Sequence, residues 1–95
     1  AARRAWAEAT AGFDAVICPT VAIAPPQLDR LETESAYYRT ENLLTLRNTR
    51  IGNLMGLPGL TLPTGVPSAG IQFLGRPMGE AALLRLGAAA EAALA

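Results

Sequence analysis

The stretch Asn53-Leu-Met-Gly-Leu-Pro-Gly-Leu-Thr-Leu-Pro-Thr-Gly-Val-Pro-Ser-Ala-Gly-Ile-Gln-Phe-Leu-Gly-Arg-Pro77 decides the fold of this 95-residue chain. Glycines and prolines divide it into two short apolar runs, Gly59–Leu62 and Gly70–Leu74, each about as long as a buried strand. The polar segment Thr64–Ala69 separates the runs and contains a proline. We therefore predict two neighbouring antiparallel strands, over residues 59–62 and 70–74.

A helical pattern precedes this stretch, over about residues 36–55. It ends near Gly56, because Pro58 disfavours helical geometry at Leu57. One stripe of the predicted helix carries Leu43, Leu46, Arg50 and Leu54, and with the neighbouring Leu44, Ile51 and Met55 it makes an apolar face that a sheet could cover. The polar and amphipathic residues of this helix have two interpretations: they are ordinary surface side chains, or they line a cleft. These residues are Tyr37, Tyr38, Arg39, Arg47 and Arg50.

A second helix is predicted after the stretch, over about residues 79–94, with small residues suited to close packing on a sheet. The chain begins with a helical pattern over about residues 2–11, in which Trp6 is a core anchor or, alternatively, marks a binding face. A short run over residues 15–18 predicts a strand buried on both faces, as in a parallel or mixed sheet. We expect Thr20–Ser35 to be an irregular surface loop.

Composition narrows the class of protein. Hydrophobic residues make up 51% of the chain and charged residues 17%, which is apolar for a free-standing domain and favours burial of some surface against a partner. Eight basic residues balance eight acidic ones, and no basic patch for nucleic acid is present. The single cysteine, Cys18, excludes an internal disulfide, and no apolar run is long enough to cross a bilayer. We expect a soluble cytoplasmic protein.

Missing residue types exclude several chemistries. Every basic residue is arginine, so no Ser-His-Asp triad, Cys-His pair or Ser-Lys pair can form within the chain. One cysteine without histidine cannot build a thiolate–imidazole zinc site. Gly52, Gly56 and Gly59 lack the Gly-Lys-Ser/Thr of a phosphate loop. We predict no catalytic, cofactor-binding or metal-binding residue, and we interpret Cys18 as a buried structural thiol and the scattered carboxylates as solvated.

Three segments together carry a resemblance to a known family. Phe13-Asp-Ala-Val-Ile-Cys-Pro-Thr20, followed by Ala24-Pro-Pro26, resembles the "DvllxPtxpxxAPp" segment of amidase signature enzymes. Asn53-Leu-Met-Gly-Leu-Pro-Gly-Leu-Thr-Leu-Pro-Thr-Gly65 is similar to that family's "NllGlPalslPcG". Gly70-Ile-Gln-Phe-Leu-Gly-Arg-Pro77, with Glu80-Ala-Ala-Leu-Leu-Arg-Leu86, resembles "GlQlvGrpxxEaxLLrla". The segments occur in the family's order and cover nearly the whole chain.

The resemblance implies an α/β fold, the C-terminal part of a large mixed sheet with helices on both sides, in which residues 1–95 form a single segment. It implies hydrolysis of carboxamides, or ammonia transfer from glutamine, by a Ser-Ser-Lys centre in the N-terminal half. Ser35 and Ser68 match none of those catalytic positions. The resemblance also implies that about Thr49–Gly56 corresponds to the family's small-residue-rich pocket wall. It does not assign a substrate contact to Arg50 or Asn53.

Two hypotheses follow. In the first, the chain is the C-terminal portion of an amide hydrolase and acts only with the remainder of the polypeptide; the chain by itself is inactive. In the second, it is a stand-alone, non-catalytic domain that associates through an apolar sheet face. Neither needs a cofactor, a nucleic acid or a membrane. The sequence leaves open the amide substrate, the oligomeric state and the hairpin register around Thr64–Ala69, where Val66-Pro-Ser-Ala69 departs from the family pattern.

Overall fold

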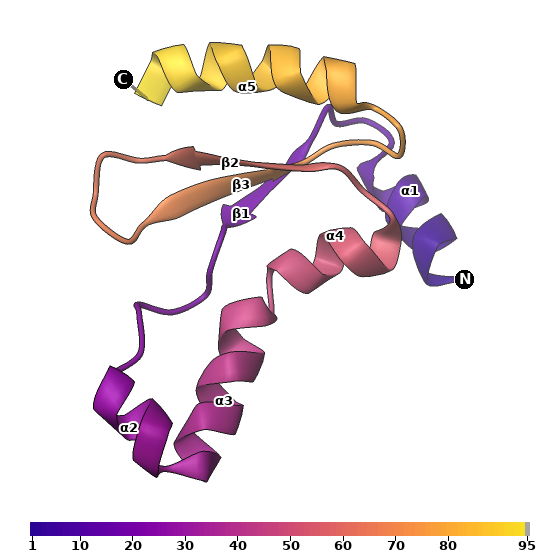
Figure 1. Cartoon of the computed structure of the whole chain (residues 1–95). Coiled ribbons are helices and arrows are strands. Elements are labelled where there is room, and N and C mark those ends of the chain that lie inside the picture. The colour runs from indigo at the N-terminus through magenta and orange to yellow at the C-terminus, as the bar shows by residue number, and fades with distance from the viewer. Residues whose placement is uncertain (95) are drawn as a thin grey trace.

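The computed structural model of the chain describes residues 1–94. Its centre is a three-stranded sheet formed by β1 (Val16–Pro19), β2 (Gly59–Pro63) and β3 (Gly70–Leu74), in the order β1-β3-β2 (Figure 1). Both pairings are antiparallel. The two strands predicted from the central stretch are therefore confirmed as a hairpin.

The hairpin register is fixed by the turn between β2 and β3. Leu62 lies opposite Ile71, and Pro63 lies opposite Gly70. The Thr64 hydroxyl donates a hydrogen bond to the Ala69 carbonyl at 2.7 Å, which closes the six-residue reversal. Within the turn, Gly65 adopts a φ of 84°, in the left-handed region where glycine is favoured.

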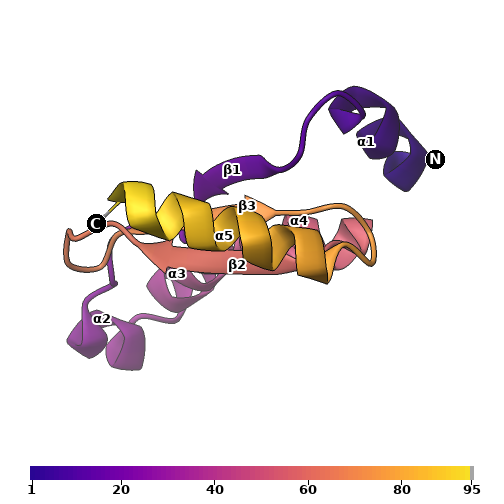
Figure 2. The same ribbon diagram turned by 90° about the horizontal axis from the view of Figure 1, so that it is seen from above.

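Helix α5 (Glu80–Leu94) covers one face of the sheet (Figure 2). Leu83 of this helix packs with Leu62 and Phe73 to form the buried core. Gly87 lies so close to β2 that a Cβ atom there would collide with the Leu60 side chain. The prediction of a C-terminal helix packed closely on the sheet is confirmed, because a small residue stands where the helix and strand meet.

The opposite face of the sheet is covered at one end by α4 (Thr49–Met55). Gly52 of α4 lies against Leu74: a Cβ at Gly52 would lie 3.2 Å from Cδ2 of Leu74. The helix ends at Gly56, whose φ of 69° and ψ of 42° place it in the left-handed conformation typical of a helix C-terminus. The predicted end of this helix is confirmed.

Helix α1 (Ala2–Thr10) lies beside α4. Nε of Arg3 donates a hydrogen bond of 3.0 Å to the carbonyl oxygen of Leu54, in the last turn of α4. A guanidinium at this position also complements the negative end of the helix dipole. The N-terminal helix predicted over residues 2–11 is thus present and is attached to α4 by a cationic side chain.

The two remaining helices, α2 (Leu28–Thr33) and α3 (Ser35–Leu46), extend away from the sheet as a helical hairpin (Figure 1). The guanidinium carbon of Arg30 lies 4.0 Å from the centre of the Tyr37 ring. The backbone N–H of Gln27 donates a hydrogen bond of 3.0 Å to the hydroxyl oxygen of Tyr37. Arg30 and Tyr37 therefore join the two helices to each other, and the structure contains no buried residue in either helix among residues 28–46.

Three local predictions are corrected. Residues 20–35 are not wholly irregular, because α2 forms within them and is stabilised by the Arg30–Glu34 ion pair of 2.9 Å one helical turn apart. The helix predicted over 36–55 is two helices, α3 and α4, separated at Arg47 and Asn48. The third correction concerns β1.

The α/β class is confirmed, but β1 is not buried on both faces and does not belong to a parallel or mixed arrangement within residues 1–94. It is an antiparallel edge strand with alternating exposure, and the side chain of Ile17 is 59% exposed. A short apolar run does not distinguish an edge strand from a central one, because both have the same local propensities.

The molecule is broad and thin, and its core is small. The radius of gyration is 15.4 Å, whereas a compact domain of this length has about 12 Å. The accessible surface is 6664 Å², whereas a compact monomer of 9.9 kDa exposes about 5200 Å². Large apolar side chains contribute to this extra surface; they include Phe13, Ile17, Leu43, Leu46, Leu54 and Met78. The chain thus has apolar surface that a further layer of protein could bury.

Candidate functional site

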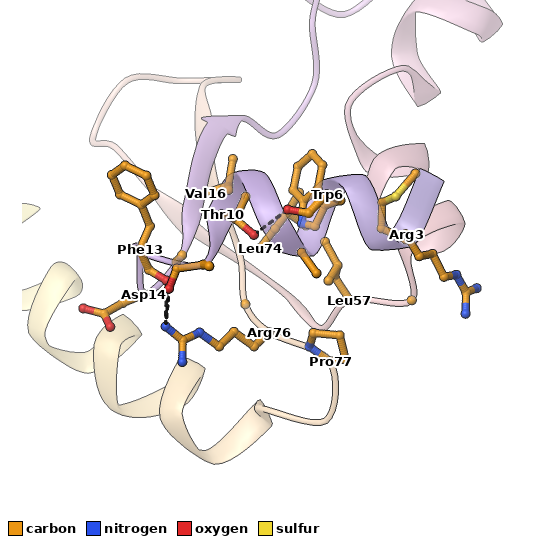
Figure 3. A pocket seen from close by; sticks show the side chains of 16 residues that line it. Arg3, Trp6, Thr10, Phe13, Asp14, Val16, Leu57, Leu74, Arg76 and Pro77 are labelled. Carbon is orange, nitrogen blue, oxygen red and sulfur yellow. Dashed lines mark hydrogen bonds between the residues drawn. The ribbon is translucent and has the colours of Figure 1, made fainter. Parts of the chain in front are cut away.

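An apolar cavity with a volume of about 400 Å³ lies between α1, the end of α4 and the end of β3 (Figure 3). Most of its lining is apolar, including Trp6, Met55, Leu57, Leu74 and Pro77. Trp6 is half-buried and lines this cavity, and it lies outside the buried core of Leu62, Phe73 and Leu83. Its position therefore does not decide between the core anchor and the binding face.

Two arginines at this cavity are engaged with the backbone. Arg3 donates to the carbonyl oxygen of Leu54, and Nη2 of Arg76 donates to the carbonyl oxygen of Phe13 at 3.1 Å (Figure 3). These bonds attach both ends of the N-terminal segment to the rest of the chain. The Thr10 hydroxyl likewise donates to the Trp6 carbonyl at 2.8 Å. The arrangement fixes the position of α1.

A smaller cleft of about 210 Å³ opens between α4 and the sheet, on the face opposite α5. We call it the α4 cleft. Its residues come from α4, from the connection that follows and from the two hairpin strands; they are Thr49, Gly52, Asn53, Leu57, Gly59, Thr61, Gln72 and Leu74. Gly52 and Gly59 lie against the Leu74 side chain: a Cβ atom would lie 3.2 Å from Cδ2 of Leu74 at Gly52 and 3.6 Å from it at Gly59.

The polar groups of the α4 cleft are all uncharged. Thr49 and Thr61 present hydroxyl groups, and Asn53 and Gln72 present carboxamides. Gln72 is the most deeply placed of them, with 4% of its surface exposed. Such groups both donate and accept hydrogen bonds, so the cleft can bind a neutral polar group. They do not supply an activated nucleophile, because the described lining contains no base to remove a hydroxyl proton.

Residues singled out in the sequence are placed apart. Asn53 lines the α4 cleft, and Tyr37 packs against Arg30 in the helical hairpin. Exposed positions on α3, on α4 and in the turn between them hold Tyr38, Arg39, Arg47 and Arg50. Ser35 begins α3, whereas Ser68 lies in the β-hairpin turn. Cys18 is half-buried on β1 opposite Gln72.

Gln72 is the site residue that the sequence patterns did not single out. The signal was a polar side chain inside the apolar run Gly70–Leu74. Alternation in a strand places Gln72 on the face opposite Phe73, but it does not tell whether that face is open to water or covered. The structure shows that Gln72 is buried on this face and lines the α4 cleft.

Two further properties bear on the class of site. Within residues 1–94, no group of three or more His, Cys, Asp and Glu side chains is arranged to hold a metal ion. The described helices are all too short or too polar to cross a membrane.

Known proteins resemble this chain in sequence. It matches the Amidase family over residues 1–84. It is 36% identical over 83 residues to 2-amino-5-chloromuconic acid deaminase of Comamonas testosteroni, covering 83% of this chain and 18% of that protein. It is 37% identical over 91 residues to a fatty acid amide hydrolase of Oryza sativa subsp. indica, covering 88% and 15%.

A third relative is a glutamyl-tRNA(Gln) amidotransferase subunit from Desulforudis audaxviator, 33% identical over 88 residues, with 90% of this chain and 17% of that protein covered. The chain therefore spans less than a fifth of the length of these three relatives. No solved structure matches it.

Proposed function

This chain belongs to the Amidase family, and from that premise we propose that it is the C-terminal portion of an enzyme that hydrolyses a carboxamide C–N bond. The observation that carries the proposal is the family match over residues 1–84, in a chain with no lysine and no histidine. The chemistry then belongs to a Ser-Ser-Lys centre elsewhere in the polypeptide, and residues 1–95 contribute scaffold and one wall of a cleft.

The exposed apolar surface supports the proposal that this chain packs against the remainder of the enzyme. Leu43 and Leu46 lie on α3 and Leu54 lies on α4, although the sequence predicted all three on one stripe of a single helix. They are exposed by 57%, 43% and 59%. A helix face with that much uncovered leucine favours burial against more protein. The accessible surface exceeds that of a compact monomer by about 1500 Å², which is more than the roughly 800 Å² that one partner buries in a standard protein–protein interface. We propose that the remainder of the amidase polypeptide covers this stripe.

The second candidate is a stand-alone, non-catalytic domain that associates with a partner or with itself. The same exposed leucines favour it. One face of the sheet is covered by α5, through Leu62, Phe73 and Leu83, whereas the opposite face is covered by α4 only at one end. In this alternative the chain associates through that second sheet face, together with the exposed leucines of α3 and α4. Both candidates are cytoplasmic, act without a cofactor and bind neither nucleic acid nor membrane.

Ammonia release separates the two candidates. The polypeptide that carries this chain at its C-terminal end is purified, and the 95-residue chain is purified beside it. Both are incubated with benzamide and propionamide. We expect release from the longer polypeptide and none from the chain. Hydrolysis by the chain, or a folded longer polypeptide that neither releases ammonia nor reacts with a serine-directed probe, contradicts the proposal.

A further inference from the structure

Strand β2 lies along one edge of the sheet, and β1 lies on the other side of β3 (Figure 2). The Gly75 N–H donates to the Pro58 carbonyl at 3.0 Å, which marks a hydrogen-bonded pair just before β2 begins. Directly opposite residues of antiparallel strands alternate between bonded and non-bonded pairs, so the N–H and C=O groups of Gly59 and Thr61 point away from β3. Both residues are exposed, as is Pro63 at the end of the strand. The outer side of β2 is therefore an open row of backbone donors and acceptors.

Strand β1 forms the opposite edge, and that edge is largely closed. The Thr20 N–H donates to the Gly70 carbonyl at 3.1 Å, so the same alternation turns the backbone groups of Ile17 and the carbonyl of Pro19 outward. Proline has no N–H to donate, and the Pro19 carbonyl already accepts a hydrogen bond of 2.7 Å from the Asn48 side chain. Proline and added contacts are ways in which sheet edges avoid pairing with further strands. A new strand would therefore find more backbone partners on β2 than on β1.

The open edge of β2 borders the α4 cleft. Gly59 and Thr61 line this cleft together with Asn53 of α4. A strand paired with the outer side of β2 would thus run beside the cleft and add protein to its rim.

We propose that the outer edge of β2 pairs with an extended strand from the remainder of the polypeptide, and that this strand completes one side of the α4 cleft. The inference rests on the proposed function, because it takes the chain to be one portion of a longer enzyme. The chain spans less than a fifth of the length of the three relatives compared, so most of such a polypeptide lies outside it. Gly59 and Thr61 supply the main-chain hydrogen bonds, as in strand addition to a sheet edge. The β1 edge receives no strand.

A second copy of the chain fits the β2 edge less well than a strand of different sequence. Two β2 strands paired antiparallel about Thr61 would place Gly59 of each copy opposite Pro63 of the other. Because proline has no N–H, the ladder would lack a donor at both of its ends. A strand from elsewhere in the polypeptide meets Pro63 at one end alone.

Hydrogen exchange of single backbone amides tests the choice of edge. It is measured by mass spectrometry on the 95-residue chain and on the polypeptide that carries this chain at its C-terminal end. We expect the Gly59 and Thr61 amides to exchange about tenfold or more slowly in the longer polypeptide, and the Ile17 amide to slow by less than that. Slowing below tenfold at Gly59 and Thr61, or of tenfold and more at Ile17, overturns the proposal.

Two further outcomes separate this proposal from its alternatives. Slow exchange of Gly59 and Thr61 in the 95-residue chain, increasing with its concentration, would make a second copy the occupant and would overturn the proposal. Ammonia release forms no part of the measurement, so the two proposals fail separately. A longer polypeptide that releases ammonia while Gly59 and Thr61 exchange quickly overturns the strand pairing alone, and slow exchange without ammonia release supports it.

Thr61→Pro and Ile17→Pro form a matched pair of variants. Each removes one outward N–H, from opposite edges of the sheet, and neither removes a hydrogen bond to β3. Proline is tolerated on an edge strand where the missing N–H faces solvent, so we expect both variants of the 95-residue chain to fold with similar changes in Tm. In the longer polypeptide, Thr61→Pro should lower the Tm by several degrees more than Ile17→Pro. Equal shifts there contradict the proposal.

Discussion

Nδ2 of Asn48 donates a hydrogen bond of 2.7 Å to the carbonyl oxygen of Pro19. The bond joins the turn between α3 and α4 to the end of β1, and it lies next to the ladder bond from Thr20 N–H to the Gly70 carbonyl. It also accounts for the interrupted helix. The side chain of Asn48 is held by β1, and the flanking backbone bonds, from Arg47 to Leu44 and from Ile51 to Asn48, span three residues instead of four.

Replacing Asn48 by leucine removes this donor, and we expect a loss of about 1 kcal/mol in the free energy of unfolding. The loss stays modest because Pro19 is exposed and water can satisfy its carbonyl. Urea unfolding followed by circular dichroism measures it. Asn42→Leu, at an exposed position on α3, is the control. Equal effects of the two substitutions would show that the Asn48–Pro19 bond does not stabilise the fold.

Gly56→Ala is expected to destabilise the chain by about 1 kcal/mol or more, because the left-handed conformation at φ 69° is unfavourable for a residue with a Cβ. The new Cβ would also lie 3.3 Å from the guanidinium carbon of Arg3. Gly12→Ala is the matched control, since a Cβ there has nothing within 4 Å and Gly12 is outside the left-handed region. Thermal unfolding of the two variants should differ; similar melting temperatures would contradict the conformational explanation.

The sequence correctly predicts the helices and strands that are marked by residues close together in the chain. Gly56 and Pro58 mark the end of α4, and the two apolar runs separated by Thr64–Ala69 mark the β-hairpin. Small residues in the last helix indicate its close packing on the sheet, which Gly87 provides. The signal for each of these features lies in residues that are near one another in the chain, even where the contact itself is distant, as between Gly87 and Leu60.

Features that depend on distant residues were missed. The helix break at Asn48 involves a hydrogen bond to the Pro19 carbonyl of β1, and no proline or glycine marks the break in the sequence. The exposure of Ile17 depends on the position of β1 as an edge strand of the sheet, which the local sequence does not show. In the sequence, Gln72 is one polar residue in a strand, and only the tertiary structure shows that it is buried and lines the α4 cleft. In all three cases a tertiary contact, not local propensity, decides the outcome.

Substituting Leu43 and Leu46 together by glutamine tests the exposed stripe. We expect a change of no more than about 0.5 kcal/mol in the stability of the 95-residue chain, because both side chains are surface residues, 57% and 43% exposed, outside the buried core. Hydrophobic-dye binding and self-association in sedimentation should fall. Leu83→Ala is the buried control: it removes a side chain that is 5% exposed, at a loss of about 2–5 kcal/mol. A large loss of stability from the double variant would mean that the stripe is covered within the chain.

The last prediction concerns acid sensitivity of the helical hairpin. Both Nε and Nη2 of Arg30 donate to the carboxylate of Glu34, at 2.9 and 3.3 Å. The hydrogen bond from Arg30 holds the pKa of Glu34 below its ordinary value of 4.5. A carboxyl whose pKa is lowered by folding stabilises the fold above its unfolded pKa, and this contribution disappears as the pH falls through the lowered value.

The ion pair should therefore support α2 at neutral pH and stop doing so as the pH falls through the lowered pKa of Glu34, where its carboxylate becomes protonated. An NMR titration of the Glu34 side-chain carboxyl carbon measures the pKa directly, and backbone amide exchange in residues 28–34 measures the stability of α2. Arg30→Gln removes the charge and the two-bond contact, so we expect the pKa of Glu34 to rise in that variant. The increase in amide exchange of residues 28–34 at acid pH should then be smaller than in the unsubstituted chain. An unchanged Glu34 pKa in Arg30→Gln would show that the pair is not formed in solution.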